Sequence, residues 1–530
     1  MRYLGLSIWS FLFFLNVNAQ TDKAKIVIGI VVDQMRYDYI PKFWDDYSDD
    51  GFKKLVSNGA FCVNTNYDYK PTYTAPGHAS IFTGTGPNHH GIVGNSWYSR
   101  KDSSQVYCVS EKNKDGSYFY SPKRLQSQTI GDMVRLSNGF KGKAFGVALK
   151  DRSAILPCGK SANAAYWFDG DSGKWISSDY YKGQNESLMD SFNQRQNINQ
   201  YINHDWNLSL PIENYAESIE DKNDYEGNLT KNGKNYFPYS IQGAFKEVGY
   251  DILKTIPQGN QMTADFAIAL IDEEKLGEDE FLDFLSISFS ATDYIGHRFG
   301  VNSKEIQDCY IKLDQTIASM IKSFDSKFGK ENYLLFLTSD HGAVENPNYL
   351  KHHNIEAGFI DDKLLKKGLE NALQQKFGGE NWILKFTNMN IYFNLETVNK
   401  SSYSKSEIYS FTKTYCENQP GIFQAFAPEF DQANNQIEQI CMRGYHPKNS
   451  GELILIEEPN WIDYSKTGST HGSPYNYDTH VPLIFYGTQI RAQKVNESVY
   501  VKDIAPTICT ILSLSFPNLT TGKAIEKVCK

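Results

Sequence analysis

Five short apolar runs restrict the fold of this chain more than any other feature. They cover residues 26–32, 144–149, 284–289, 333–337 and 481–486, and apolar side chains dominate each run rather than alternating regularly with polar ones. A strand that is buried on both faces has such a composition, which is typical of a parallel sheet covered by helices. We therefore predict that these runs are buried parallel strands.

A helical spacing of apolar residues separates the runs. Apolar side chains recur every three or four residues from Ile306 to Phe324. Near the C-terminus, Asp503 is placed to cap a helix whose inner face runs from Ile504 to Leu512. Because strands alternate with helices, we predict an α/β fold with a doubly wound, mostly parallel sheet.

Two segments depart from this alternation. Residues 160–245 are rich in Asn, Tyr, Ser and Gly, and residues 345–450 combine one helical pattern with stretches rich in Asn and Gln. The chain has 530 residues, of which 40% are hydrophobic, so it can bury a large core. We expect one large domain over residues 20–530 that carries the two segments as cap insertions.

The N-terminus has the pattern of a secretory signal peptide over residues 1–19. Arg2 precedes a short apolar run from Leu6 to Leu15, and the small-residue site at Val17–Gln20 follows it. The run is shorter than the roughly 20 apolar residues that a membrane span needs, and no later stretch is long enough. We expect a periplasmic or secreted protein without a membrane span.

Charge and cysteine content exclude further classes. The net charge is −9 and no basic tract occurs, so nucleic acid is not an expected partner. The eight cysteines form no CxxC pair, which leaves a cysteine zinc site without support. In an exported chain Cys416 and Cys441 could close a loop as a disulfide, although the sequence does not fix the pairing.

Polar residues with metal-binding side chains stand at the ends of the predicted strands. Asp33, Lys150, Asp293 and Asp340 follow four of the runs, and ligands bind outside the carboxyl ends of strands in open α/β sheets. A single Asp at such a place is usually a turn or helix cap, but four functional residues are harder to explain in that way.

The spacing of these residues suggests metal chemistry. Asp293 and His297 lie one helical turn apart, Asp340 and His341 are adjacent, and His480 precedes a strand. Aspartate and histidine suit zinc, and two neighbouring sites would make a bimetal centre.

Thr74 is the candidate nucleophile. Pro76 suits an early helical position, so the Thr74 hydroxyl would lie near a helix N-terminus, where backbone N–H groups favour a phosphate. A hydroxyl bound to zinc can lose its proton and attack phosphorus. Taken alone, Thr74 would be better explained as a helix cap.

Together these motifs resemble the alkaline phosphatase superfamily, and within it the phosphate-irrepressible (PafA-type) alkaline phosphatases of Gram-negative bacteria. The resemblance covers nearly the whole mature chain. It rests on residues 31–36, 74–78, 149–152, 293–297, 340–342, 477–480 and 503–507.

The resemblance implies a secreted, two-zinc phosphatase that hydrolyses phosphate monoesters through a phospho-Thr74 intermediate. It implies one zinc ion held by Asp293, His297 and His480, and a second held by Asp33, Asp340 and His341. His471 competes with His480 for the first metal, and we prefer His480. By the same resemblance, Asn95, Lys150 and Arg152 hold the phosphoryl oxygens. The sequence leaves the oligomeric state open, with a monomer as the working expectation.

Three other functions predict residues that differ from those of a monoester phosphatase. A phosphodiesterase or nucleotide pyrophosphatase of the same superfamily shares the metal cage, but the cations of Lys150 and Arg152 suit a dianionic terminal phosphate. A sulfatase needs Cys or Ser where this chain has Thr74, so we exclude it. A non-catalytic phosphate- or metal-binding protein would be expected to have lost some of the ligands, and this chain keeps them all.

Overall fold

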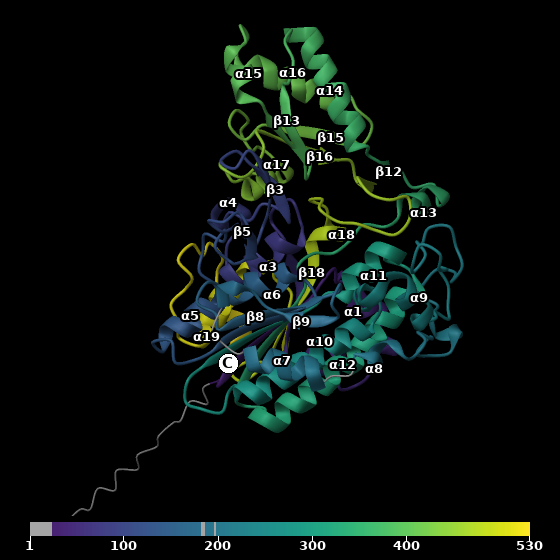
Figure 1. The fold of residues 1–530 in the computed structure, drawn as a ribbon, viewed down its shortest axis with the longest axis vertical. Helices are drawn as coiled ribbons and strands as arrows, with labels where there is room; N and C mark the ends of the chain where they lie inside the picture. Colours follow the sequence, from purple (N-terminus) through teal and green to yellow (C-terminus); the bar gives the residue numbers. More distant parts are fainter. Residues whose placement is uncertain (1–23, 182–185, 196–197, 530) are drawn as a thin grey trace, which may run out of the picture.

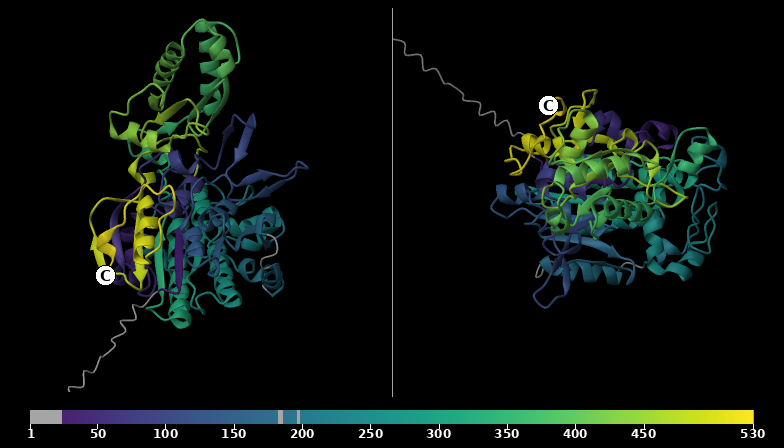
Figure 2. Two further views of the ribbon diagram at one scale, coloured as in Figure 1. Left: turned by 90° about the vertical axis from the view of Figure 1, so that its left-hand side faces the viewer. Right: turned by 90° about the horizontal axis from the view of Figure 1, so that it is seen from above.

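The computed structural model describes residues 24–181, 186–195 and 198–529. The predicted signal peptide, residues 1–19, lies outside the described residues. Within the described ranges, every helix is too short or too polar to span a lipid bilayer. The molecule has a large α/β body and a smaller lobe, drawn in green at the top of Figure 1, that projects from it. The side view in Figure 2 shows the same separation.

A ten-stranded sheet forms the centre of the body. Its strand order is β19-β2-β18-β11-β1-β10-β7-β8-β9, and β20 pairs with β2. The strands are β1 (Ile26–Val32), β2 (Ala60–Asn66), β7 (Ala144–Ala148), β8 (Ala164–Asp169), β9 (Lys174–Ile176), β10 (Asp283–Phe289), β11 (Tyr333–Thr338), β18 (His480–Gly487), β19 (Gln493–Val495) and β20 (Val499–Tyr500). Four of the five predicted runs are therefore confirmed as neighbouring parallel strands, β11, β1, β10 and β7.

The register of these strands brings their carboxyl ends to one edge. Val32 of β1 is level with Phe289 of β10, and Val31 is level with Thr338 of β11. The backbone N–H of Asp33 donates to the carbonyl oxygen of Phe289 over 3.0 Å, so the alignment continues past the strand end. Residues that follow these strands are consequently neighbours in space, although hundreds of positions separate them in sequence.

The predicted parallel direction of the fifth run, residues 481–486, is wrong. β18 is a strand, but it pairs antiparallel with both β11 and β2. Burial on both faces produces the apolar composition of β18, and burial does not depend on strand direction. One antiparallel strand in a mostly parallel sheet keeps the predicted α/β class.

Helices cover the sheet in two groups. The first contains α3 (Thr74–Thr83), α5 (Ile130–Ser137), α6 (Asp151–Cys158) and α19 (Ile504–Ile511), and the second contains α10 (Gln258–Glu274), α11 (Ala291–Phe299) and α12 (Lys304–Phe328). Members of each group contact one another, and both groups contact β10. The helix expected from the spacing between Ile306 and Phe324 is confirmed as α12.

We expected the Asp503 side chain to cap α19, and it does not. It occupies the N-cap position, but its carboxylate accepts hydrogen bonds from the backbone N–H groups of Tyr500 and Lys523, each over 2.8 Å. It therefore ties two loops together and leaves the first turn of the helix without a side-chain cap.

A second sheet defines the cap lobe, which we take as residues 362–457. Its strand order is β13-β14-β16-β15, formed by Ile383–Thr387, Asn390–Phe393, Leu453–Glu457 and Ile422–Phe426. The helices α14 (Asp362–Phe377) and α16 (Lys405–Glu417) pack on it. Leu365, Leu369 and Leu373 of α14 lie in a core cluster separate from that of the body, whereas Leu364 is exposed. This lobe extends past residue 450.

The earlier segment, residues 160–245, is not wholly an insertion over the sheet. Its first part forms β8 and β9, which extend the central sheet beyond β7. Its later part contains the short helices α7 (Glu186–Arg195), α8 (Asn199–Ile202) and α9 (Ile241–Val248), of which α7 and α8 contact α10.

The loop-closing disulfide is not formed. All eight cysteines lie in the described residues and are free thiols. Cys416 belongs to the main core cluster of the cap lobe, whereas Cys441 belongs to a separate cluster with Phe426, Ile454 and Ile456.

The packing of α3 against the end of β11 gives a first prediction. Replacing Gly by Ala inside a helix normally stabilises it by roughly 0.5–1 kcal/mol. At Gly77 an added Cβ would overlap the backbone oxygen of Asp340. We expect Gly77→Ala to destabilise the protein by about 1–3 kcal/mol because helix and strand end must separate. The guanidinium unfolding midpoint measures this.

Gly243→Ala is the matched control for this prediction. Gly243 lies in α9, and the nearest atom to its added Cβ would be Ser240 Oγ at 3.3 Å, the end of a rotatable side chain. Its unfolding midpoint should stay the same or rise slightly. If Gly77→Ala also raised the midpoint, the close packing of α3 on Asp340 would be wrong.

Candidate metal centre and catalytic site

Three buried carboxylates meet at the carboxyl edge of the sheet. Asp33 directly follows β1, Asp340 follows β11 by two residues, and Asp293 lies in the first turn of α11. The side chains of all three are at least nine-tenths buried. The backbone N–H of Gln34 donates to Asp340 Oδ1 over 3.1 Å, and its side-chain Nε2 donates to Asp293 Oδ1 over 2.8 Å.

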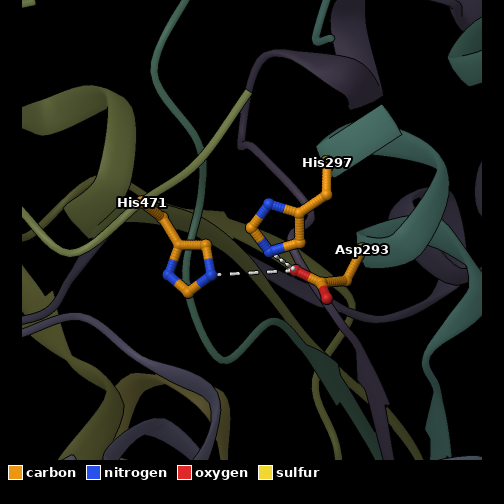
Figure 3. A group of neighbouring side chains, drawn as sticks. All are labelled: Asp293, His297 and His471. Carbon is orange, nitrogen blue, oxygen red and sulfur yellow. Dashed lines mark ion pairs between the residues drawn. The ribbon is translucent and has the colours of Figure 1, made fainter. Parts of the chain in front are cut away.

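Two histidines approach Asp293 from different parts of the chain. His297 lies one turn later in α11, with Nε2 3.2 Å from Asp293 Oδ1. His471 reaches the same oxygen from a loop before β18, with Nε2 at 3.8 Å. Figure 3 shows both rings directed at the Asp293 carboxylate. A third imidazole, that of His341, stacks on His471 with ring centroids 3.4 Å apart.

The three imidazoles share one hydrogen-bonding pattern. Nδ1 of His297 lies 2.8 Å from the carbonyl oxygen of Ser469, Nδ1 of His341 lies 2.9 Å from that of Gly342, and Nδ1 of His471 lies 2.7 Å from that of Thr72. A carbonyl oxygen only accepts, so each Nδ1 carries the proton. In a neutral ring this leaves the Nε2 lone pair directed at the carboxylates.

Burial keeps two of these rings neutral. It lowers the pKa of His471 well below its ordinary value, and the nearby His341 and His297 lower it further. Burial also lowers the pKa of His341, although Asp340 and Asp293 oppose the shift. Lone pairs of neutral imidazoles facing carboxylate oxygens repel them unless a cation lies between, which is the arrangement of a metal site.

The carboxylates themselves fit a metal centre. Asp33 Oδ1 and Asp340 Oδ2 are buried and have no hydrogen-bond partner among the described residues. Burial, and next the charge of Asp340, raises the pKa of Asp33 well above its ordinary value. Two groups have ligand atoms within 4.8 Å of one another, namely Asp293 with His297 and His471, and Asp33 with Asp293 and His341. Oxygen and imidazole donors in this arrangement suit a pair of divalent ions such as zinc.

Lys150 is the N-cap of α6 and enters the same cluster. Its Nζ donates to Asp33 Oδ2 over 2.6 Å and to Asp293 Oδ2 over 2.5 Å. Burial alone would lower the pKa of Lys150, but the carboxylates of Asp293 and Asp33 more than offset this and hold the pKa above its ordinary value. The ammonium group is therefore charged next to the carboxylates.

Thr74 faces the cluster from the start of α3. It is the first residue of the helix, its side chain does not cap the helix, and only 1% of its surface is exposed. Its Oγ1 lies 3.5 Å from Nε2 of His341. Since Tyr73 takes the N-cap position, the explanation of Thr74 as a helix cap fails.

Asn95 and Arg152 are linked to this helix start by a hairpin, β3 (Ser96–Ser99) and β4 (Ser104–Tyr107). Asn95 precedes β3, and its Oδ1 accepts a hydrogen bond from the backbone N–H of Ala75 over 2.9 Å. Arg152 Nη1 donates to the hydroxyl of Tyr107, at the end of β4, over 3.2 Å. Both residues therefore lie at the end of the site where α3 and α6 begin.

The structure places His471, rather than His480, beside Asp293. His480 belongs to neither metal-binding group. Its Nε2 donates to the carbonyl oxygen of Val63 over 2.9 Å, and its ring stacks on Tyr37. The reason lies in the topology, because β18 begins beside β2 and β11 separates it from β1 and Asp33.

Sequence reasoning missed part of the supporting shell. Gln34 bridges two carboxylates from a backbone conformation with φ 63°. Nδ1 of His78 lies 2.9 Å from the carbonyl oxygen of Thr74 and 3.3 Å from Asp340 Oδ2. Gln34 follows Asp33 directly, but an amide at a strand end has no pattern that indicates this role.

Comparison with known proteins places the chain in a family. Residues 27–481 match the family described as type I phosphodiesterase / nucleotide pyrophosphatase. A protein of Myroides odoratus named calcium-transporting ATPase is 38% identical over 98% of this chain and 97% of its own. Alkaline phosphatase PafA of Elizabethkingia meningoseptica is 36% identical over 96% of this chain and 94% of its own.

Solved structures agree with these relatives. The crystal structure of wild-type alkaline phosphatase PafA superposes with a TM-score of 0.91 at 36% identity, covering 96% of this chain and 99% of that one. A PafA variant with one threonine replaced by serine, and an asparagine, a lysine and an arginine replaced by alanine, superposes equally well. The chain therefore belongs to the type I phosphodiesterase / nucleotide pyrophosphatase family of the alkaline phosphatase superfamily, and it is similar to the PafA-type enzymes throughout its described fold.

Proposed function

We propose that this protein is a zinc-dependent alkaline phosphatase that hydrolyses phosphate monoesters through a phosphothreonine at Thr74. One observation carries the proposal. The buried Thr74 hydroxyl at a helix start faces carboxylates and imidazole lone pairs, and cations bound between these groups would offset their mutual repulsion. The names of the PafA relatives add support, because those proteins are alkaline phosphatases.

The metal ligands follow from the orientation of the side chains. Asp293, His297 and His471 would hold one zinc ion, with His471 in place of the expected His480. Asp33 and His341 would hold the other, together with Asp340, whose Oδ2 lies outside both metal-binding groups but 3.6 Å from Nε2 of His341. Bound there, two zinc ions would supply Lewis acidity for the nucleophile and the leaving oxygen at neutral to alkaline pH.

The chain itself positions the nucleophile. Thr74 Oγ1 forms the new bond to phosphorus, and the positive end of the α3 dipole lies at the transferred phosphoryl group. His78 fixes the backbone at Thr74. Burial excludes bulk water, so these fixed charges and dipoles act strongly on the transition state.

Lys150, Arg152 and Asn95 would stabilise the phosphoryl oxygens. The PafA variant supports their assignment, because its substituted threonine and asparagine are 21 positions apart and its lysine and arginine are two apart. Thr74 with Asn95, and Lys150 with Arg152, have the same spacings. Arginine can hold two oxygens in a fork, and lysine adds a compact charge.

A phosphodiesterase or nucleotide pyrophosphatase is the second candidate, since the matched family carries that description. A diester has two non-bridging oxygens and one negative charge, whereas a monoester has three and nearly two charges. The cations near Thr74 fit the monoester better, and we retain it as the main proposal. The protein would be exported to the periplasm or the medium and would act there on small-molecule phosphate monoesters.

The nucleophile assignment predicts the outcome of removing one hydroxyl. Thr74→Ala should abolish turnover of p-nitrophenyl phosphate while zinc content, measured by mass spectrometry, stays unchanged. Thr74→Ser should keep part of the activity because a hydroxyl remains. Thr83→Ala, at the other end of α3, is the control and should keep near-normal turnover. Substantial activity in Thr74→Ala would exclude the covalent mechanism.

The ligand assignment predicts different effects at two histidines. His471→Ala should lose about one zinc ion per chain after dialysis against a weak chelator, because its Nε2 faces Asp293. His480→Ala should keep both ions, since its ring contacts Val63 and Tyr37 instead. Equal zinc loss in both variants, or greater loss in His480→Ala, would contradict the assignment.

The substrate class is tested best at Arg152, because Lys150 also contacts two carboxylates of the metal centre. Losing one preorganised contact typically costs about 10²–10³ in rate. Arg152→Ala should therefore lower kcat/KM for an aryl phosphate by about that factor and lower it far less for the methyl aryl diester. Equal losses on both substrates, or a wild type that prefers the diester, would favour the phosphodiesterase.

A further inference from the structure

A cavity of about 200 Å³ lies where the cap lobe meets the body. From the body, Tyr73 and His471 line it, and from the cap lobe Phe386 and Asn388 do so. Tyr73 directly precedes Thr74, and His471 faces Asp293 of the candidate metal centre. The cavity therefore lies beside the residue that precedes the nucleophile and beside the metal-binding group of Asp293, His297 and His471.

Its lining has an unusual chemistry. Four aromatic side chains line it, namely Tyr73, Phe386, Trp461 and Tyr477. Four carboxyl groups also line it, those of Asp362, Glu457, Asp463 and Asp478. Among the described residues that line the cavity there is neither a lysine nor an arginine. Aromatic faces combined with carboxylates bind organic ammonium groups, whereas an anion would be repelled.

The carboxyl groups that line the cavity differ in whether they have a partner within the protein. Glu457 is already paired with Lys70. Asp478 is only 1% exposed, and its Oδ2 accepts hydrogen bonds from the backbone N–H groups of Gly472 and Ser473. Its Oδ1 is buried and has no hydrogen-bond partner among the described residues. A buried, unpartnered oxygen in the wall of a cavity indicates a missing donor or cation.

Asp362 and Asp463 stand closer to the solvent. Asp362 begins α14, and Asp463 follows β17 (Trp461–Ile462). Partial burial, and next the charges of Asp362 and Asp361, raise the pKa of Asp463 to about 6, whereas Lys363 opposes the shift only weakly. Asp362 and Asp463 line the same cavity, so one positive charge bound there would reduce their mutual repulsion.

We propose that this cavity receives the leaving group of the substrate and selects one that carries an ammonium charge. The substrate class is then the phosphate monoesters of amino alcohols, with phosphocholine as its simplest quaternary member. Thr74 Oγ1 gives its proton to water and bonds to phosphorus as the ester P–O bond breaks, and the leaving oxygen takes a proton from water to give the free amino alcohol. A second water molecule then hydrolyses the phosphothreonine to Thr74 and inorganic phosphate. This inference rests on the proposed phosphomonoesterase function.

The experiment compares two substrates of nearly the same shape. Phosphocholine and 3,3-dimethylbutyl phosphate differ mainly in the positive charge of the leaving group. That charge also makes choline the better leaving group in water, so the ratio of the two kcat/KM values in wild type proves nothing alone. The change in this ratio between wild type and variants isolates the contribution of the cavity.

The expected result is specific to the lining carboxylates. Asp463→Asn and the double variant Asp362→Asn with Asp463→Asn should lower the ratio by roughly two- to fivefold for each carboxylate removed. The kcat/KM for the neutral ester should change little. Asp361→Asn is the matched control, because it removes the adjacent charge outside the lining and Asn still caps α14.

Each outcome gives a decision. A ratio that does not move in Asp463→Asn and the double variant, or that falls as much in Asp361→Asn, overturns the inference. If the double variant does not fold, exposed Asp463→Asn alone decides. Turnover of p-nitrophenyl phosphate distinguishes failure of this inference from failure of the proposed function. If wild type hydrolyses it but the ratio does not change in the variants, only the substrate class is wrong. If wild type hydrolyses no monoester, the proposed function fails.

Discussion

The repulsion among three buried carboxylates is the constraint on which the site depends. Asp33, Asp293 and Asp340 are brought together because β1, β10 and β11 are level at their carboxyl ends. In a poorly solvated interior such charges need cations or hydrogen-bond donors. Lys150 supplies one cation and Gln34 supplies hydrogen-bond donors. The Nε2 lone pairs of the three histidines increase the demand for positive charge rather than reduce it. The cluster is therefore a candidate site for metal ions.

Helix α3 turns this cluster into a possible reaction centre. Gly77 lets the helix touch the backbone of Asp340. Nδ1 of His78, in the first turns of the helix, lies 3.3 Å from the carboxylate of Asp340. Thr74 is thereby held with its hydroxyl toward His341. The hairpin before Tyr107 carries Asn95 and contacts Arg152, so the groups proposed to hold the phosphoryl oxygens are attached to rigid elements.

The cap lobe has its own sheet and core, and its contribution to the site is the wall of one cavity. The buried pair of Lys70 and Glu457 joins the body to the last strand of the lobe close to this cavity. A lobe that folds around a separate core can change its lining residues without disturbing the metal centre. This separation suits a division between chemistry, carried by the body, and choice of leaving group, carried partly by the lobe.

The sequence by itself determined five central strands of the body sheet and the α/β class, and it indicated most of the side chains that the structure brings together at the carboxyl edge. Unbroken apolar runs follow from burial on both faces, and polar residues after them mark the ligand edge of such a sheet, so the gathering of Asp33, Lys150, Asp293 and Asp340 could be predicted. Thr74 was indicated separately, by its place before Pro76 at a predicted helix start. Only the tertiary structure decided the direction of β18 and which of the two histidines lies beside Asp293. Burial leaves the same apolar pattern in a strand of either direction, and both histidines stand near the same strand in sequence. Which imidazole reaches Asp293 depends on how the 470s loop folds back onto Thr72, a long-range contact that no local spacing encodes.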